Sequence, residues 1–251
     1  QPLLTHSILK NIKIPVVRDP RNQEAIASML SAYDDLIENN RRRIQLLEQS
    51  ARLLYKEWFI HLRFPGHEHV NITDGIPEGW VYPQVKDLIG QIKRPMKIKK
   101  SDYLEKGTYP CVDQSTSFIG GYTEESHAII DIGTPVIVFG DHTRILKYVD
   151  FPFASGADGT QLLISKQKDI TQEYLYFALD GIDLSNYFYA RHFKFLKDQQ
   201  VPYPSKELVR HFTDFARPVM NQVKTLRDIC RKLVSARDLL LPRLFNGDIS
   251  P

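Results

Sequence analysis

Basic, amide and hydroxyl side chains gather in four short segments between residues 91 and 194. In the segment 91–100, five of ten residues are lysine or arginine, and Pro95 favours an extended chain. Such a stretch is suited to contacts with the phosphates of a nucleic-acid backbone. In the segment 139–144, an apolar run ends in a glycine turn that displays polar side chains, among them Arg144. An arginine there can donate two hydrogen bonds to the major-groove edge of guanine.

Two further segments have a similar character. Residues 187–194 interleave aromatic residues with arginine, histidine and lysine, and residues 113–117 form a polar run with one amide and three hydroxyl groups. Amide and hydroxyl groups can bond to base edges or to phosphates. The candidate DNA-contacting residues of the four segments are Lys93, Arg94, Lys97, Lys99, Lys100, Gln114, Ser115, His142, Thr143, Arg144, Arg191, His192 and Lys194.

Each segment also has a simpler interpretation. The run 91–100 can be a solvated basic loop, and 113–117 can be an ordinary turn at the end of a strand. Asp141 can organise a turn by accepting hydrogen bonds from loop amides, with His142 buried and hydrogen-bonded beside it. The aromatic residues of 187–194 can belong to the core, while only its basic residues face solvent.

Motifs for the common catalytic chemistries are missing from this sequence. It contains no Gly-x-Gly loop, no phosphate-binding Gly-x4-Gly-Lys-Ser/Thr loop, no Asp/Glu-x-Lys nuclease motif and no Gly-x-Ser-x-Gly elbow. It also lacks the Asp/Asn-Pro-Pro-Tyr/Phe motif with which amino-methyltransferases hold a flipped base. We therefore expect no catalytic residue and no cofactor. His67-Glu68-His69 has no third or fourth ligand nearby, so we interpret it as an exposed loop and expect no metal site.

Composition sets the broad class of the protein. The 251 residues are 42% hydrophobic and 25% charged, which is typical of globular chains with a sizeable core. The net charge of +3 is too small to indicate a nucleic-acid partner, so any such surface must come from clustering. No apolar run approaches the ~20 residues of a membrane span. Without signal-peptide features, and with only Cys111 and Cys230, the chain is expected to be cytoplasmic, away from membranes.

Two long segments carry a heptad pattern of apolar residues. A long helix with so narrow an apolar stripe needs another helix beside it, so we expect the two to pack against each other through their heptad positions. Pro218 is expected to kink the second helix or delay its start, and Ser205 to cap it. The first pattern is Ile26, Leu30, Tyr33, Ile37, Asn40, Ile44, Leu47, Ala51, Leu54 and Trp58. The second is Val209, Phe212, Ala216, Val219, Val223, Leu226, Cys230, Leu233, Arg237 and Leu240.

The chain also contains an internal repeat. Ile14-Pro15 before the first helix matches Val201-Pro202 before the second, about 185 residues later, which indicates tandem duplication. The region between them contains short β-rich runs and a short helix that we expect Thr171 to cap. We therefore predict an α+β protein. Its expected parts are a tail of a preceding domain or a linker (1–20), a long helix (21–64), a mixed α/β domain (65–203), and a second long helix with the C-terminal segment (204–251).

These features together resemble the specificity (S) subunit of type I restriction-modification systems. The segment 236–249, ARDLLLPRLFNGDI, resembles that family's characteristic ending. The first helix, from Gln23 to Phe59, resembles its central conserved helix. Gly79-Trp80, and the segment 138–144 with its downstream Phe153-Ala154, resemble features of its variable target recognition domain.

The resemblance implies a role in DNA recognition without catalysis. In this family each target recognition domain inserts loops into the major groove and reads one half of a split site on double-stranded DNA. The two long conserved helices pack as an antiparallel coiled coil, and the resemblance implies the same arrangement here. They set the gap and dock methyltransferase (M) subunits, which carry S-adenosylmethionine and methylate adenine at N6. Restriction (R) subunits add translocation and cleavage. Because one complete recognition domain is present, we expect the C-terminal half of a longer subunit, or a half-subunit that pairs with itself through its long helices.

Two other functions stay open at this point. One is an enzyme with a non-local active site around Asp141, His142 and Ser155. The other is a coiled-coil adaptor that binds only proteins and does not read DNA. Catalytic turnover by the chain alone would favour the first, and failure to protect DNA together with an M subunit would favour the second.

Overall fold

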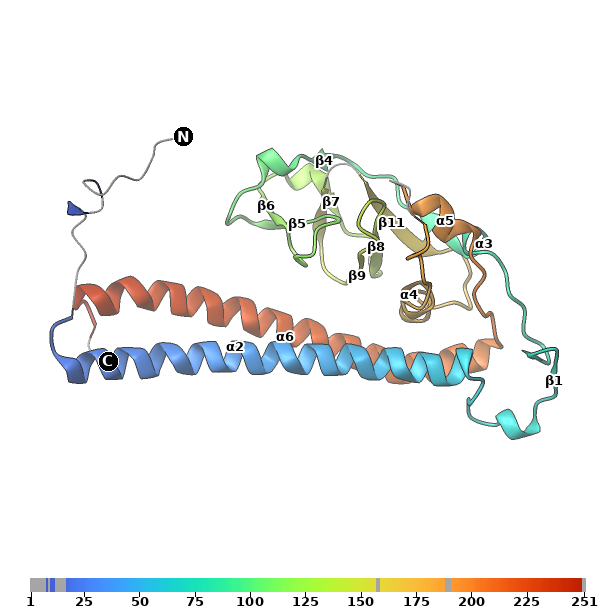
Figure 1. Cartoon of the computed structure of the whole chain (residues 1–251). Coiled ribbons are helices and arrows are strands. Elements are labelled where there is room, and N and C mark those ends of the chain that lie inside the picture. Colours follow the sequence, from blue (N-terminus) through green and yellow to red (C-terminus); the bar gives the residue numbers. More distant parts are fainter. Residues whose placement is uncertain (1–7, 9, 12–16, 157–158, 188–190, 250–251) are drawn as a thin grey trace. The chain divides into compact units, whose positions relative to one another are not determined.

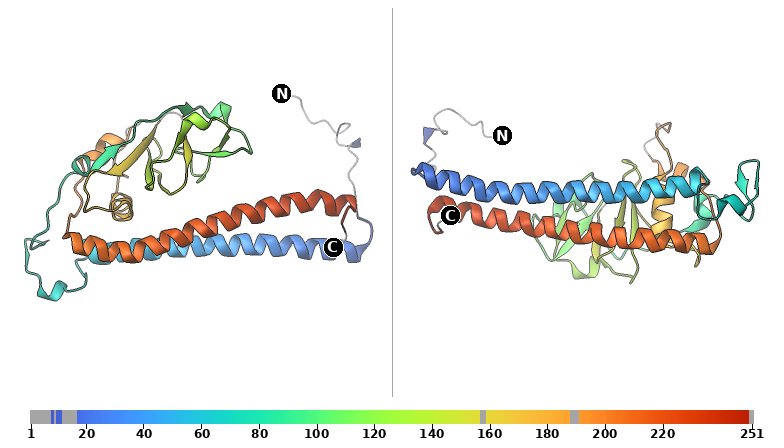
Figure 2. Two further views of the ribbon diagram at one scale, coloured as in Figure 1. Left: turned by 180° about the vertical axis from the view of Figure 1, so that it is seen from behind. Right: turned by 90° about the horizontal axis from the view of Figure 1, so that it is seen from below.

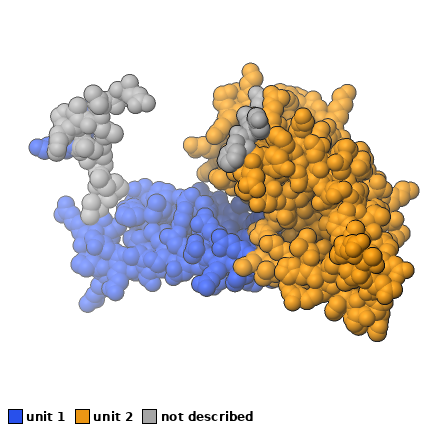
Figure 3. All heavy atoms as spheres, turned by 45° about the vertical axis from the view of Figure 1, so that its right-hand side comes forward, with its two compact units in different colours: residues 1–47, 222–251 blue, residues 48–221 orange. Residues whose placement is uncertain are grey.

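The computed structural model describes residues 8, 10, 11, 17–156, 159–187 and 191–249 (Figure 1). The chain divides into two compact units: residues 1–47 with 222–251, and residues 48–221 (Figure 3). The two long helices pass from one unit into the other, so each unit contains a part of both. None of the helices in the described residues combines the length and apolar composition that a membrane span requires.

The first unit is built from the N-terminal part of α2 (Pro20–Tyr55) and the C-terminal part of α6 (Lys206–Asn246), which run side by side (Figures 1 and 2). Cys230 Sγ lies 3.8 Å from the carbonyl oxygen of Ile37, and Arg237 Nη1 lies 2.6 Å from Asp34 Oδ1. These two contacts join residues 34–37 of α2 to residues 230–237 of α6. Every residue of the two heptad patterns is buried or half-buried, as the spacing predicts.

The second unit contains the sheets. One four-stranded antiparallel sheet has the order β3-β11-β8-β9, and a second, mixed sheet has the order β4-β10-β5-β6, with β7 paired to β10. A two-stranded ribbon, β1-β2, precedes both. The strands of the first sheet are β3 (Ile89–Gln91), β11 (Thr160–Ser165), β8 (Val136–Gly140) and β9 (Leu146–Val149). Those of the others are β4 (Lys97–Ile98), β10 (Phe153–Gly156), β5 (Tyr109–Val112), β6 (Gly121–Thr123), β7 (Ile129–Ile130), β1 (Ile72–Thr73) and β2 (Ile76–Pro77).

Short helices complete this unit, and the prediction of an α+β fold is confirmed. They are α3 (Val85–Leu88), α4 (Gln172–Asp180) and α5 (Phe193–Asp198). Thr171 caps α4 as predicted, because its hydroxyl accepts a hydrogen bond of 3.2 Å from the amide of Tyr174. Ser205 does the same for α6, accepting 3.3 Å from the amide of Leu208.

Pro218 does not delay the start of the second helix, which was one of its two predicted effects. Helix α6 begins at Lys206 and continues through Pro218 to Asn246, and the predicted kink stays a prediction. The apolar contacts on either side of the proline explain why the helix continues, since Ala216 and Met220 are both buried in the core of the second unit. At the end of α2, residues Lys56–Ile60 form a π-helical turn. The expected domain bounds stay a prediction, and most of 1–20 lies outside the described residues.

An aromatic cluster forms the centre of the second unit. The ring of Phe212, from α6, makes edge-on contacts with five other rings at centroid distances of 5.5 to 6.2 Å. Edge-on contact suits aromatic pairs because the positive ring edge meets a negative ring face. The five neighbours come from the end of α2 and from α4: Tyr55, Trp58, Phe59, Tyr174 and Phe177.

Two ion pairs bind the same elements together. Glu173 on α4 has a side chain only 5% exposed and accepts hydrogen bonds of 2.7 and 3.4 Å from the guanidinium of Arg217 on α6. Asp180, at the other end of α4, accepts from Arg52 on α2. The short helix α4 is therefore held to both long helices by charge as well as by its rings.

Replacing Phe212 by alanine should destabilise the second unit by about 3–5 kcal/mol, because a cavity replaces the ring at the centre of the cluster. Unfolding in urea, followed by the fluorescence of the two tryptophans, Trp58 and Trp80, measures this directly. Phe215→Ala is the matched control: the Phe215 side chain is 41% exposed on the same helix, and its loss should cost less than about 1 kcal/mol. If both variants lost the same free energy of unfolding, the assignment of the cluster as the core would be contradicted.

Candidate nucleic-acid interface

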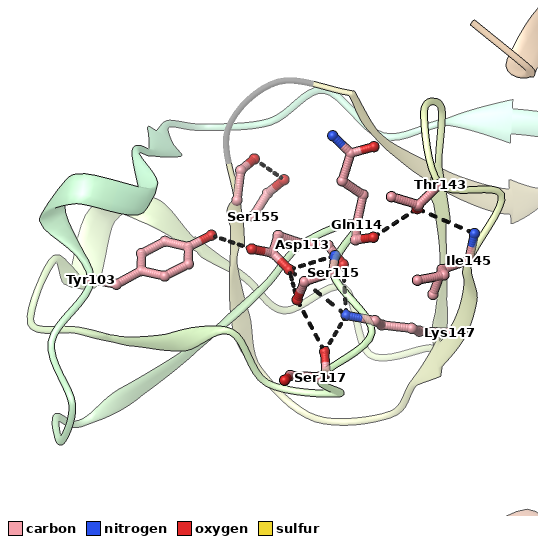
Figure 4. A network of polar contacts seen from close by, with 10 residues as sticks. Tyr103, Asp113, Gln114, Ser115, Ser117, Thr143, Ile145, Lys147 and Ser155 are labelled. Atoms are coloured by element: carbon pink, nitrogen blue, oxygen red, sulfur yellow. Dashed lines mark hydrogen bonds and ion pairs between the residues drawn. The ribbon is translucent and has the colours of Figure 1, made fainter. Parts of the chain in front are cut away.

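Two polar loops of the second unit meet, and two glycines from a third connection lie against them (Figure 4). The loops are 113–117 after β5 and 141–145 between β8 and β9, and the glycines are Gly156 at the end of β10 and Gly159 just before β11. Glycines permit the close approach. A Cβ added to Gly159, which has a φ of +75°, would lie 2.5 Å from His142 Cδ2 and 2.6 Å from Gln114 Nε2. A Cβ added to Gly156 would overlap the side chain of Asp113.

Gln114 is held by the neighbouring loop. The Thr143 hydroxyl donates a hydrogen bond of 2.7 Å to the carbonyl oxygen of Gln114 and accepts one of 3.3 Å from the Ile145 amide (Figure 4). The amide of His142 donates to Gln114 Oε1 at 3.1 Å. The sequence predicted two separate polar loops, and the structure joins them into one surface.

Asp113 is the buried centre of the first loop. Its carboxylate accepts from the amide of Ser115 at 2.9 Å, from the Ser115 hydroxyl at 2.5 Å and from the Tyr103 hydroxyl at 3.2 Å. Burial by itself would raise the pKa of this carboxyl, but the Ser115 hydrogen bonds and the charge of Lys147 outweigh it, and the pKa lies below its ordinary value of 3.8. The carboxylate's contribution to stability is therefore fully present above pH 3.8 and is lost only as the pH falls through the lower value of the folded state.

The basic segment lies beside strand β10. Strand β4 pairs in parallel with β10, with Lys97 opposite Ser155 and Ile98 opposite Gly156. Arg94 donates to the carbonyl oxygen of Thr160 at the start of β11. The four lysines of the segment are exposed, whereas Arg94 is half-buried and so has a structural role in addition to its charge. These lysines are Lys93, Lys97, Lys99 and Lys100.

Asp141 connects the second loop to the start of α5. Its carboxylate accepts from the amide of Phe193 at 2.7 Å, and its carbonyl oxygen accepts from the amide of His192 at 2.8 Å. This is the Asp-centred turn of the simpler interpretation, except that His142 is exposed rather than buried. Arg144 is also exposed, with a left-handed φ of 64°, and its guanidinium donates to the carbonyl oxygen of Leu184 at 3.1 Å.

His192 departs from its predicted role. Its side chain is only 6% exposed, because α5 packs its first turn against the 141–145 loop, so its ring is not displayed for contact with a ligand. The neighbouring Arg191 and Lys194 are exposed. Residues 188–190, with two of the four aromatic residues of that segment, lie outside the described residues.

Sequence reasoning missed the role of Lys147. This lysine is 4% exposed on β9, and its ammonium donates to the carbonyl oxygens of Asp113 and Ser117 at 2.7 and 2.6 Å (Figure 4). The signal was present: one lysine interrupts the apolar alternation of a short strand whose other residues are buried or half-buried.

The geometry does not assemble the alternative active site. The Asp141 carboxylate accepts a hydrogen bond from the backbone amide of Phe193. The Ser155 hydroxyl is fully buried and donates to the carbonyl oxygen of Gly156 at 3.1 Å. A nucleophile and its base need to be within hydrogen-bond reach of each other, and these groups are bonded elsewhere. Within the described part of the chain, no three His, Cys, Asp or Glu side chains are grouped so that they could hold a metal ion. Burial, with the nearby Asp113 charge, raises the pKa of the Cys111 thiol to about 11, which leaves it un-ionised at neutral pH.

Replacing Gly156 by alanine should push the 113–117 loop out of place, because the new methyl group would overlap Asp113. We expect a loss of about 1–3 kcal/mol in the free energy of unfolding, measured by urea denaturation. Gly181→Ala is the control, since its added Cβ would meet only ordinary contacts at 3.5 Å and beyond. A Gly156→Ala variant as stable as the control would show that the loops do not meet as described.

Comparison with known proteins gives a consistent picture. The family model "Type I restriction modification DNA specificity domain" matches residues 1–49. The MjaIX specificity subunit of a type I restriction enzyme from Methanocaldococcus jannaschii is 24% identical over 278 residues, which cover 99% of this chain and 63% of that subunit. The EcoR124I/EcoR124II specificity subunit from Escherichia coli is 31% identical over 118 residues, 44% of this chain and 28% of that subunit.

A solved structure shares the fold. The S subunit of a type I restriction-modification system from M. genitalium matches with a TM-score of 0.59 and 21% identity, over 96% of this chain and 65% of that one. The chain thus spans somewhat less than two thirds of the length of the relatives that match almost all of it. In sequence and in fold, this chain resembles the specificity subunits of type I restriction-modification systems, as its helix and recognition-domain motifs predicted.

Proposed function

We propose that this chain is a non-catalytic DNA-recognition subunit, which directs type I methyltransferase and restriction subunits to a split target site. One observation carries the proposal: the polar loops 113–117 and 141–145 are hydrogen-bonded to each other, and the basic segment 91–100, with four exposed lysines, pairs through β4 with the neighbouring strand β10. Such a surface combines sequence-independent attraction to phosphates with groups able to read base edges. The named roles of the similar proteins support the same function.

The candidate residues divide between two tasks in this proposal. Lys93, Lys97, Lys99 and Lys100 contact backbone phosphates, and Arg191 and Lys194 extend the basic surface. Gln114, Ser115, His142, Thr143 and Arg144 lie on the loops that read bases. Arg94 holds the basic segment to β11 through Thr160, and His192 supports the start of α5 from within.

We also propose that α2 and α6 form an antiparallel coiled coil that docks M subunits and sets the gap between two half-sites. The burial of both heptad patterns and the Ile37–Cys230 and Asp34–Arg237 contacts support it. Asn40, 8% exposed in the first pattern, is suited to fixing the register of the helices. Pairing of two copies through these helices, association with R subunits through the complex, and action in the cytoplasm belong to the same proposal.

The test is methylation mapping in a host that carries this chain together with its M subunit. Single-molecule sequencing of the genomic DNA should show N6-methyladenine in a split motif. A palindromic motif would indicate two copies of this chain, because two-fold protein symmetry imposes two-fold symmetry on the site. An asymmetric motif would indicate that another recognition domain is supplied. No new methylation, with both proteins soluble and associated, would contradict DNA recognition and favour a protein-binding adaptor.

The double variant Lys99→Ala/Lys100→Ala should weaken binding to motif-bearing and scrambled duplexes alike. Each phosphate contact that is lost should reduce the slope of log affinity against log salt concentration by about 1. Fluorescence anisotropy at several salt concentrations measures both effects. Lys168→Ala is the control, since Lys168 is exposed in the same unit at the opposite end of β11. If the control weakens binding as much as the double variant, the basic segment is not the phosphate-binding surface.

A further inference from the structure

A lysine that cannot touch DNA lies directly beneath the proposed reading loops. Lys147 is 4% exposed, so its ammonium does not reach a phosphate at the surface. Strand alternation turns its side chain to the same face as Val149, which packs with Val136 and Val138 in a small apolar cluster. An apolar residue would fill this place at less cost, because an ammonium loses its hydration when it is buried.

Two hydrogen bonds and one ion pair join that ammonium to one loop. The ammonium donates to the carbonyl oxygen of Asp113 at 2.7 Å and to that of Ser117 at 2.6 Å, and it lies 3.8 Å from the Asp113 carboxylate. Asp113 and Ser117 are the two ends of the 113–117 loop. Lys147 therefore clamps the base of the loop, whose middle residues Ser115 and Thr116 are half-buried and exposed.

The clamp also fixes how the loop meets its neighbour. With its ends held, Gln114 lies where Thr143 Oγ1 donates to its carbonyl oxygen and the His142 amide donates to its side-chain oxygen. The loop and the 141–145 turn thus have one relative position. A surface that reads bases needs such a fixed geometry, because base discrimination depends on hydrogen bonds of defined direction.

We propose that Lys147 is a positioning residue for DNA sequence readout, which sets specificity by fixing the 113–117 loop without itself touching DNA. This inference rests on the proposed function. It distinguishes Lys147 from the exposed lysines, because loss of a phosphate contact weakens binding to all sequences whereas loss of the clamp changes which sequences are accepted.

The test uses the chain in complex with its M subunit, in the methylation assay above. Lys147→Met keeps an unbranched apolar side chain, one atom shorter than lysine, but removes the ammonium and all its N–H donors. Methylation of single-base variants of the mapped motif, relative to the motif itself, should rise by about tenfold at the positions that this loop reads. Affinity for a random-sequence duplex should stay within about twofold of the unmodified chain.

Two further variants separate positioning from simple folding. Lys147→Gln keeps a donor for one carbonyl oxygen, so its loss of discrimination should lie between that of the unmodified chain and that of Lys147→Met. If the methionine variant is poorly folded, the glutamine variant provides the test. Lys166→Met, at an exposed lysine at the end of β11, should leave the motif unchanged. The unfolding midpoint of each variant is measured in parallel.

The possible outcomes are distinct. Relaxed discrimination in folded Lys147 variants, with random-sequence affinity retained, supports the proposal. An unchanged motif, or equal losses on all sequences, overturns it and leaves Lys147 with a purely structural role. Absence of methylation by the unmodified chain would instead overturn the proposed function.

Discussion

The ring contacts around Phe212 are the interaction on which the rest of the second unit depends. They join the end of α2, the start of α6 and the short helix α4 in one apolar cluster. The four-stranded sheet packs against this cluster through residues such as Ile137 and Leu163, both fully buried. The end of α2 and the start of α6, separated by 150 residues of chain, therefore share a core with the sheet whose strands β8 and β9 flank the 141–145 loop.

The interface itself is held by a different kind of interaction. Asp113, Lys147 and the Thr143 hydroxyl are bonded to backbone groups of the loops, so polar contacts determine the loop positions. Such contacts have direction, whereas apolar burial does not, and a surface that discriminates between bases needs direction. The small glycines Gly156 and Gly159 complete the arrangement by allowing side chains of one loop to lie against the backbone of another.

This division assigns separate tasks to charged residues of the same type. Lys99 and Lys100 are exposed and suited to phosphates, whereas Lys147 is buried and bonded to carbonyl oxygens. Arg94 and Arg144 combine a positive charge with a structural role, because each donates a hydrogen bond to a carbonyl oxygen of a neighbouring segment. The net charge of the chain is a poor guide to such a surface. A positive side chain can attract phosphates in one place and hold a loop in position in another.

The sequence by itself determined the long helices, their seams, the caps at Thr171 and Ser205, and the polar segments that carry the candidate site. These follow from periodicity and from local hydrogen bonding, which are properties of neighbouring residues. The sequence also carried the resemblance to specificity subunits. Only the tertiary structure decided that His142 is exposed while His192 is buried, and that α6 continues through Pro218. Only it decided that Lys147 clamps a loop 30 residues away in the chain. Exposure and long-range hydrogen bonding depend on which distant segments pack together, and spacing along the chain does not fix that.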